Sequence, residues 1–276
     1  MVLASLKEAL SRVADTPVLW IPGIFIGSLF SLVFILQVRG STVLGARAGF
    51  LGLVALPFFL GGAYGIIRGD GRDLRAYLSA GRRYYFRILL AGAVIIAAAS
   101  LTILLVILPF TLAGGALQAA GSLALLSVSL SFAFFIYFFD TAVVLEDRKV
   151  LDSIRRSVEF TLIRPVETLV FYLVNMAIGT LILFLSAIIW SFFIADRLTP
   201  LMAVNQSTLQ GMPADQLMSL VGPAGLWSGA AIGFFAVLFG GTILISFKAC
   251  FFSRHATLSA KPPEGEFDEK GRFYRY

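Results

Sequence analysis

The sequence predicts an all-α polytopic membrane protein with six transmembrane helices. The 276 residues are 58% hydrophobic and only 14% charged, whereas a soluble domain carries roughly 25% charged residues. Six apolar stretches are long enough to cross a hydrocarbon layer about 30 Å thick as helices. They are apolar on every side, which excludes the alternating pattern of membrane β-strands. The stretches run over residues 17–38, 48–67, 86–110, 117–145, 166–195 and 226–252.

The connections between these stretches alternate in positive charge. Residues 68–87 hold six arginines, and residues 146–164 hold four arginines and one lysine. Residues 111–116 hold neither arginine nor lysine, and the first and fifth connections hold few. Because cytoplasmic loops carry the excess of Lys and Arg, we expect both termini and both arginine-rich loops in the cytoplasm. The membrane is expected to be the plasma membrane.

A segment with helical apolar spacing precedes each of the three expected hairpins. Leu74, Tyr77, Leu78 and Gly81 fall on one face of a helix, and similar sets occur within residues 3–13 and 150–158. Basic residues fill the other positions, which is typical of helices that lie on an anionic membrane surface. The candidate contacts with lipid headgroups are Arg75, Arg82, Arg83, Arg155 and Arg156.

The chain is therefore expected to form a single six-span domain, residues 1–255, built from three repeated units. These units cover about 1–69, 70–147 and 148–255, and a polar cytoplasmic tail follows at 256–276. Each unit would be a cytoplasmic amphipathic surface helix followed by a membrane hairpin. Pro17 and Pro165 stand at the first and third turns from surface helix to span, where a proline is tolerated. The second turn holds Tyr84, Tyr85 and Phe86 instead.

One stretch carries a resemblance to known sequences. It reads Val143-Val144-Leu145-Glu146-Asp147, followed by Asp152-Ser153-Ile154-Arg155-Arg156-Ser157-Val158-Glu159-Phe160. It resembles a motif of a loose group of uncharacterised prokaryotic and archaeal six-span membrane domains, which includes the membrane domain fused to some glycerophosphodiester phosphodiesterases. The resemblance implies a six-span helical fold and no activity, since the group shares no catalytic residues.

Few polar residues lie within the expected spans. Asp140 would sit about 9 Å inside the cytoplasmic end of the fourth span, where an ionisable group costs on the order of 2–3 kcal/mol and needs a partner. Lys248 is the first candidate partner, ahead of Arg87 and Arg68, and Asn175 is a further intramembrane polar residue. Two interpretations stay open: a proton or cation site, and a structural interhelical pair, which is the favoured one.

The composition favours a protein that is not an enzyme. One cysteine, Cys250, and one histidine, His255, cannot complete a metal site, and no nucleophile with a base, no cofactor motif and no nucleic-acid platform can be assembled. Asn205-Gln206-Ser207 fits a glycosylation acceptor in the longest outer connection.

Three functions remain open. The first is a non-catalytic scaffold, accessory subunit or assembly factor whose partners are other membrane proteins. The second is a transporter or channel for a small or lipidic solute, with a site near the cytoplasmic ends of spans four to six. The third is a protein that binds anionic lipid or shapes the membrane.

Overall fold

The computed structural model describes residues 2–69, 71–112, 118–196, 214–259, 265–267 and 273–275. The candidate glycosylation site Asn205 and the polar segment around Lys261 lie outside these residues. Six helices are long and apolar enough to cross a membrane, which confirms the six predicted spans. Their bounds are Pro17–Val38, Thr42–Arg68, Leu74–Thr111, Ala120–Leu145, Pro165–Phe193 and Gly222–Ala256.

The spans correspond to helices of different construction. A 3₁₀ turn begins the first span, and the fourth span is divided into two helices. The last is kinked at Gly222, whose φ of 69° interrupts the helix. The elements are η1 (Pro17–Trp20), α2 (Ile21–Val38), α3 (Thr42–Arg68), α4 (Leu74–Leu112), α5 (Gln118–Ile136), α6 (Phe139–Leu145), α8 (Pro165–Phe193) and α11 (Ala214–Ser259).

Two of the three predicted surface helices form separate elements, α1 (Val2–Asp15) and α7 (Val150–Ile163). Each ends just before a proline, because the residue preceding proline avoids the helical conformation. Thr16 and Arg164 accordingly have φ near −130° and ψ values of 89° and 59°, which lie outside the helical region.

The prediction of a separate surface helix before the third span is wrong. Residues 74–81 form the first turns of α4, which continues as one helix to Leu112. No proline interrupts the chain at Tyr84–Phe86, so nothing ends the helix there. Tyr77 and Tyr84 are instead fully buried, on the part of α4 that packs against α3.

Helix α1 packs on α11 through a face of mostly small residues. Val2, Ser5, Ala9 and Val13 are buried, whereas Leu3 is exposed. The predicted lipid-directed face included Val13, which the structure places inside the protein. The exposed leucines lie on the other side of the helix.

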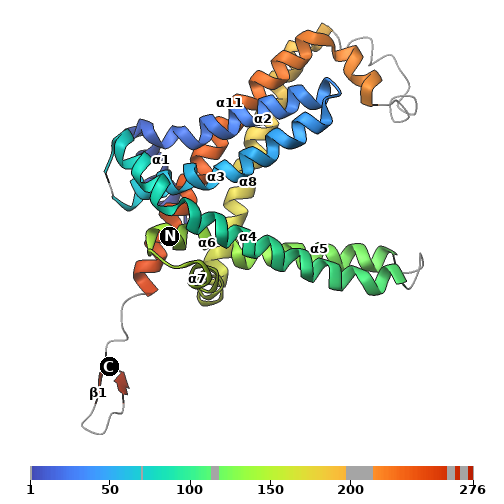
Figure 1. Cartoon of the computed structure of the whole chain (residues 1–276). Helices are drawn as coiled ribbons and strands as arrows, with labels where there is room; N and C mark the ends of the chain where they lie inside the picture. Colours follow the sequence, from blue (N-terminus) through green and yellow to red (C-terminus); the bar gives the residue numbers. More distant parts are fainter. Residues whose placement is uncertain are drawn as a thin grey trace.

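The buried core lies at one end of the molecule, called the inner end below, where α1, α6 and α7 meet the ends of the long helices (Figure 1). The charged segments also gather there: Arg87 pairs with Asp147, and the Arg12 side chain donates to the Ile67 carbonyl. The N-terminus and both arginine-rich loops thus share one end of the protein, as the charge pattern requires.

Away from the inner end the long helices diverge. Helices α2, α3 and α11 run in one direction, and the α4–α5 hairpin runs in another (Figure 1). Two short strands in the tail, β1 (Gly265–Phe267) and β2 (Phe273–Arg275), pair antiparallel. Among the described residues, these are the only strands.

Candidate functional site

The candidate site is a buried ion pair between α6 and α11. The Lys248 ammonium lies 2.7 Å from Asp140 Oδ1 and 2.9 Å from Oδ2. The Tyr64 hydroxyl donates to the same Oδ2 at 3.2 Å, and the ammonium lies 4.1 Å from the centre of the Tyr137 ring, a cation–π distance. Asp140 and Lys248 are only 4% and 7% exposed. The structure thus brings the two predicted partners into contact.

A break in the fourth span positions Asp140. Helix α5 ends at Ile136, two residues form a turn, and α6 starts at Phe139. Asp140 thus occupies the first turn of a short helix, where a carboxylate is favoured by the helix dipole. The break also leaves backbone groups without helical partners, which must be satisfied by other means inside a membrane.

Side chains from α7 and α8 satisfy these backbone groups. Ser157 accepts a hydrogen bond from the Phe138 amide at 3.0 Å and donates one to the Phe135 carbonyl at 2.8 Å. The Tyr172 hydroxyl donates to the Phe134 carbonyl at 3.0 Å. The break is therefore a fixed part of the fold, held by residues from two other helices.

Aromatic side chains pack around the turn. Phe138 lies at their centre and is fully buried. The distance from its ring centre to the ring centres of four phenylalanines on α7, α8 and α11 is 4.9 to 6.0 Å. Such packing excludes water and strengthens the ion pair beside it, because charges interact more strongly at low dielectric. The neighbours are Phe160, Phe171, Phe251 and Phe252.

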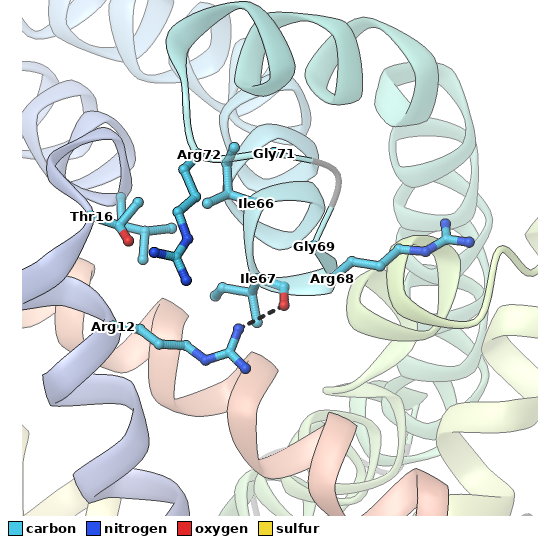
Figure 2. Close-up of a pocket in the computed structure, with 9 residues that line it drawn as sticks. Arg12, Thr16, Ile66, Ile67, Arg68, Gly69, Gly71 and Arg72 are labelled. Carbon is cyan, nitrogen blue, oxygen red and sulfur yellow. Dashed lines mark hydrogen bonds between the residues drawn. The ribbon is translucent and has the colours of Figure 1, made fainter.

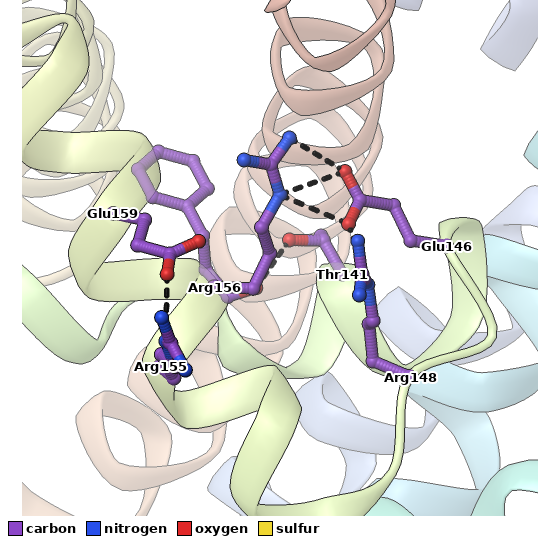
Figure 3. A network of polar contacts seen from close by, with 7 residues as sticks. Thr141, Glu146, Arg148, Arg155, Arg156 and Glu159 are labelled. Atoms are coloured by element: carbon purple, nitrogen blue, oxygen red, sulfur yellow. Dashed lines mark hydrogen bonds and ion pairs between the residues drawn. The ribbon is translucent and has the colours of Figure 1, made fainter. Parts of the chain in front are cut away.

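A second polar network closes the end of α6 (Figure 3). The Arg156 Nε and Nη2 atoms each donate a hydrogen bond of 2.9 Å to the Glu146 carboxylate. The Arg148 Nε atom donates another to the same carboxylate at 3.1 Å. The Arg156 and Glu146 side chains are 13% and 18% exposed. This arrangement does not fit the prediction that Arg156 contacts lipid headgroups, because its guanidinium is committed to a carboxylate of the same chain.

The other candidate headgroup contacts remain near the surface. Arg155 pairs with Glu159, and Arg83 pairs with Asp147. Arg75 and Arg82 are exposed, and no ion pair involving either is recorded among the described residues. These two arginines are the most available of the predicted set.

Asn175 is not joined to the ion pair. Its Nδ2 donates to the Phe171 carbonyl of its own helix at 2.9 Å, and within the described part of the chain its buried Oδ1 has no hydrogen-bond partner. The structure therefore brings together two of the three predicted intramembrane residues.

Sequence reasoning missed Tyr64, Tyr137 and Ser157. Tyr64 lies in the Gly-rich segment of α3, which allows α4 to approach closely: a Cβ at Gly62 would fall 2.7 Å from the Tyr77 ring. Ser157 is the last residue of the Ser-apolar-basic-basic-Ser motif, and its role depends on a hydrogen bond between helices that spacing alone does not reveal.

The chemistry open to this site is restricted by its partners. Both Asp140 oxygens accept hydrogen bonds: Oδ1 from the Thr141 amide at 2.7 Å, and Oδ2 from Tyr64 and Lys248. The charges of the carboxylate and the ammonium cancel. Within the described ranges, no group of three His, Cys, Asp or Glu side chains is placed to hold a metal ion. The geometry fits a structural link between the fourth and sixth spans.

Comparisons with known proteins agree with an uncharacterised membrane domain. No curated protein and no solved structure matches the chain. Residues 1–239 match a family described as a domain of unknown function, DUF7847. This match agrees with the predicted uncharacterised domain and leaves the phosphodiesterase fusion and the prokaryotic origin as predictions. Since the match covers most of the 276 residues, the chain belongs to the DUF7847 family.

Proposed function

We propose that this protein is a non-catalytic integral membrane protein that holds other membrane proteins, as a scaffold, accessory subunit or assembly factor of the plasma membrane. The observation that carries this proposal is the uncovered α4–α5 limb, defined as residues 92–111 and 120–136. None of these described residues is buried. The limb diverges from α2, α3 and α11 (Figure 1), so most of its surface is open to lipid or to another protein.

The composition of the limb suits contact with further helices. Membrane helices associate by close packing, which small residues permit. Small side chains occur along both helices of the limb, and the Ser127 and Ser131 hydroxyls donate to carbonyls of their own helix at 2.8 Å. These hydroxyls therefore do not oppose an apolar contact. The small residues include Ala97, Ala98, Ala99, Ser100, Ala124 and Ser127.

The Asp140–Lys248 ion pair supports a function that is neither catalysis nor transport. Asp140 and Lys248 are both buried, and each neutralises the charge of the other. A catalytic or transporting group needs a polar atom that is directed at its ligand, whereas both Asp140 oxygens already accept hydrogen bonds, Oδ1 from the Thr141 amide and Oδ2 from Tyr64 and Lys248.

Photocrosslinking in native membranes tests the scaffold proposal. A photoreactive amino acid replaces Leu104 or Leu126 on the limb, which are 60% and 63% exposed. The matched control is Phe50 on α3, which is 66% exposed. The limb positions should give discrete heavier protein adducts, and the control should give lipid adducts alone. Limb positions that yield only lipid adducts, in a protein that migrates at its own mass, would contradict the proposal.

Transport of a small or lipidic solute is the second candidate, because the fourth span is broken directly beside Asp140. Transporters commonly place their ion or substrate site at such interruptions. In this case Asp140→Asn should abolish flux in reconstituted liposomes, since the carboxylate would have to exchange Lys248 for the solute. Flux that persists in Asp140→Asn would remove this assignment.

A further inference from the structure

A pocket of about 580 Å³ lies at the inner end (Figure 2), and neither Asp140 nor Lys248 lines it. It is enclosed by α1, η1, the end of α3 and the loop that leads to α4. Three of its nine lining residues are arginines, and none of the nine is acidic. Pockets that bind small ligands measure roughly 300–1,000 Å³, so the volume suffices for a small anion or a lipid headgroup.

Two of the three arginines are directed at the pocket. Arg12 and Arg72 point into the same space from different elements (Figure 2). The Arg68 side chain points away from it, and its guanidinium donates to the Tyr84 hydroxyl and the Val144 carbonyl. The pocket therefore has two cationic groups available for a ligand.

Arg12 is held in position by its own protein. Its Nη1 donates to the Ile67 carbonyl at 2.8 Å, and its Nη2 contacts Glu8 at 3.0 Å. A guanidinium has five N–H donors, so donors remain for a ligand after these two contacts. The Ile67 contact fixes the arginine at the pocket and lowers the cost of ordering it on binding.

Arg72 is exposed, and in the described part of the chain no ion pair is recorded for it. It follows Gly69 and Gly71, whose φ values of 109° and 135° are in the region that favours glycine. Asp70, which lies between these glycines in sequence, is outside the described residues. Arg72 is thus the less constrained of the two arginines. A substitution there removes fewer contacts within the protein than one at Arg12, so its effect on ligand binding is easier to interpret.

The pocket lies at the ends of the first two candidate spans, where lipid headgroups are expected. Its apolar wall includes Leu19, Ile66 and Ile67, which stand at the inner ends of the first two spans, Pro17–Val38 and Thr42–Arg68. The arginines belong to the segments just outside these spans. An amphiphilic ligand would meet apolar side chains on one side and two guanidinium groups on the other.

We propose that this pocket binds a phosphate group through Arg12 and Arg72. The phosphate belongs either to an anionic phospholipid of the adjacent leaflet or to a soluble phosphate ester. Arginine suits this ligand because its planar fork of N–H donors matches the oxygens of phosphate. The proposal is independent of whether the α4–α5 limb holds a partner.

The test uses the full-length protein purified in a non-ionic detergent. Its thermal unfolding is followed during titration with short-chain phosphatidic acid, glycerol 3-phosphate, inorganic phosphate or short-chain phosphatidylcholine. The variant is Arg72→Gln, and the control is Arg75→Gln, which removes the same charge from an exposed arginine three residues away that does not line the pocket. Arg72→Gln should weaken binding by about tenfold, the effect of losing a hydrogen bond to a charged group, while Arg75→Gln stays near the unchanged protein.

The outcomes separate the ligand sources. Stabilisation by phosphatidic acid alone supports a lipid headgroup, and stabilisation by glycerol 3-phosphate or inorganic phosphate as well supports a site for the phosphate group itself. Arg12→Lys keeps the positive charge but removes the planar set of guanidinium N–H donors, so it should also weaken phosphate binding. Absence of stabilisation by every phosphate compound, or equal losses in Arg72→Gln and Arg75→Gln, would overturn the proposal, because equal losses mean diffuse charge attraction.

Discussion

Lys248 of the sixth span lies 2.7 Å from Asp140 of the fourth, at the point where the fourth span is broken. The two paired residues are 108 positions apart in sequence. Its energetic role follows from burial: a lone charge at this position has no water to solvate it, whereas the pair satisfies both groups.

Removal of one partner should therefore be costly, and removal of both should be mild. Asp140→Asn or Lys248→Met is expected to lower the free energy of unfolding by about 3–5 kcal/mol, because the remaining charge is left buried and alone. The double variant Asp140→Leu with Lys248→Met should recover most of this loss. Thermal unfolding in detergent measures the effect.

The control for this prediction is Asp152→Asn. Asp152 is an exposed carboxylate on α7, so its loss should change stability by less than about 0.5 kcal/mol. Single variants of the pair that unfold like the control would show that the ion pair does not stabilise the fold.

Ser157→Ala tests how the break in the fourth span is held. The substitution leaves the buried Phe138 amide without its partner, which costs about 1–3 kcal/mol. Ser153→Ala is the matched control, because the equally buried Ser153 hydroxyl donates only to Val150 of its own helix. Thermal unfolding of the two variants should rank Ser157→Ala as the more harmful, and the reverse order would contradict the bridging role.

The six spans and the Asp140–Lys248 pair were predictable from the sequence, because both follow from the cost of polar groups in lipid. The length of a span can be read from hydrophobicity alone. Two opposite charges at a similar depth in the membrane are expected to pair, because each is costly there without a partner. The break at Tyr137 and Phe138 was not predictable. Neither residue is proline or glycine, and the turn is stabilised by Ser157 and Tyr172 from other helices.

The pairing of the α7 arginines likewise depends on contacts with distant parts of the chain. Arg156 and Arg155 are neighbours with the same local pattern, and both were predicted to contact lipid. In the structure the Arg156 side chain pairs with Glu146 and is 13% exposed, whereas the Arg155 side chain is 82% exposed. Only the path of the chain after α6 decides which arginine meets the carboxylate, and composition does not encode that path.

This difference in burial predicts different energies for the two ion pairs on α7. Glu146→Gln removes the charge held by two Arg156 nitrogens and should destabilise the protein by about 1.5–3 kcal/mol. Glu159→Gln removes the partner of the exposed Arg155 and should cost about 0–1 kcal/mol. Unfolding measured at low and high salt should show that the Glu159 effect fades with salt. Equal effects for the two variants would contradict the ranking by burial.

Close packing of α2 against α11 predicts a strong effect at one glycine. A Cβ at Gly23 would lie 2.4 Å from the Leu238 carbonyl oxygen, which belongs to the backbone and cannot rotate away. Gly23→Ala should therefore destabilise the protein by about 1–3 kcal/mol. Gly179→Ala is the control, since a Cβ there meets no atom within 4 Å and alanine favours a helix over glycine. A Gly23→Ala variant as stable as Gly179→Ala would mean that the two helices are not in contact as described.

The charge alternation predicts the orientation of the chain, which labelling of single cysteines can determine. In a background with Cys250→Ala, a cysteine replaces Ser41 in the first connection or Lys149 in the second arginine-rich loop. Both positions lie outside the six spans. A membrane-impermeant maleimide should label Ser41→Cys in intact cells and Lys149→Cys only after permeabilisation, because loops rich in Lys and Arg stay in the cytoplasm. The opposite labelling would place the arginine pocket and the N-terminus on the outer side of the membrane. Labelling of both positions in intact cells would contradict the three spans that separate Ser41 from Lys149.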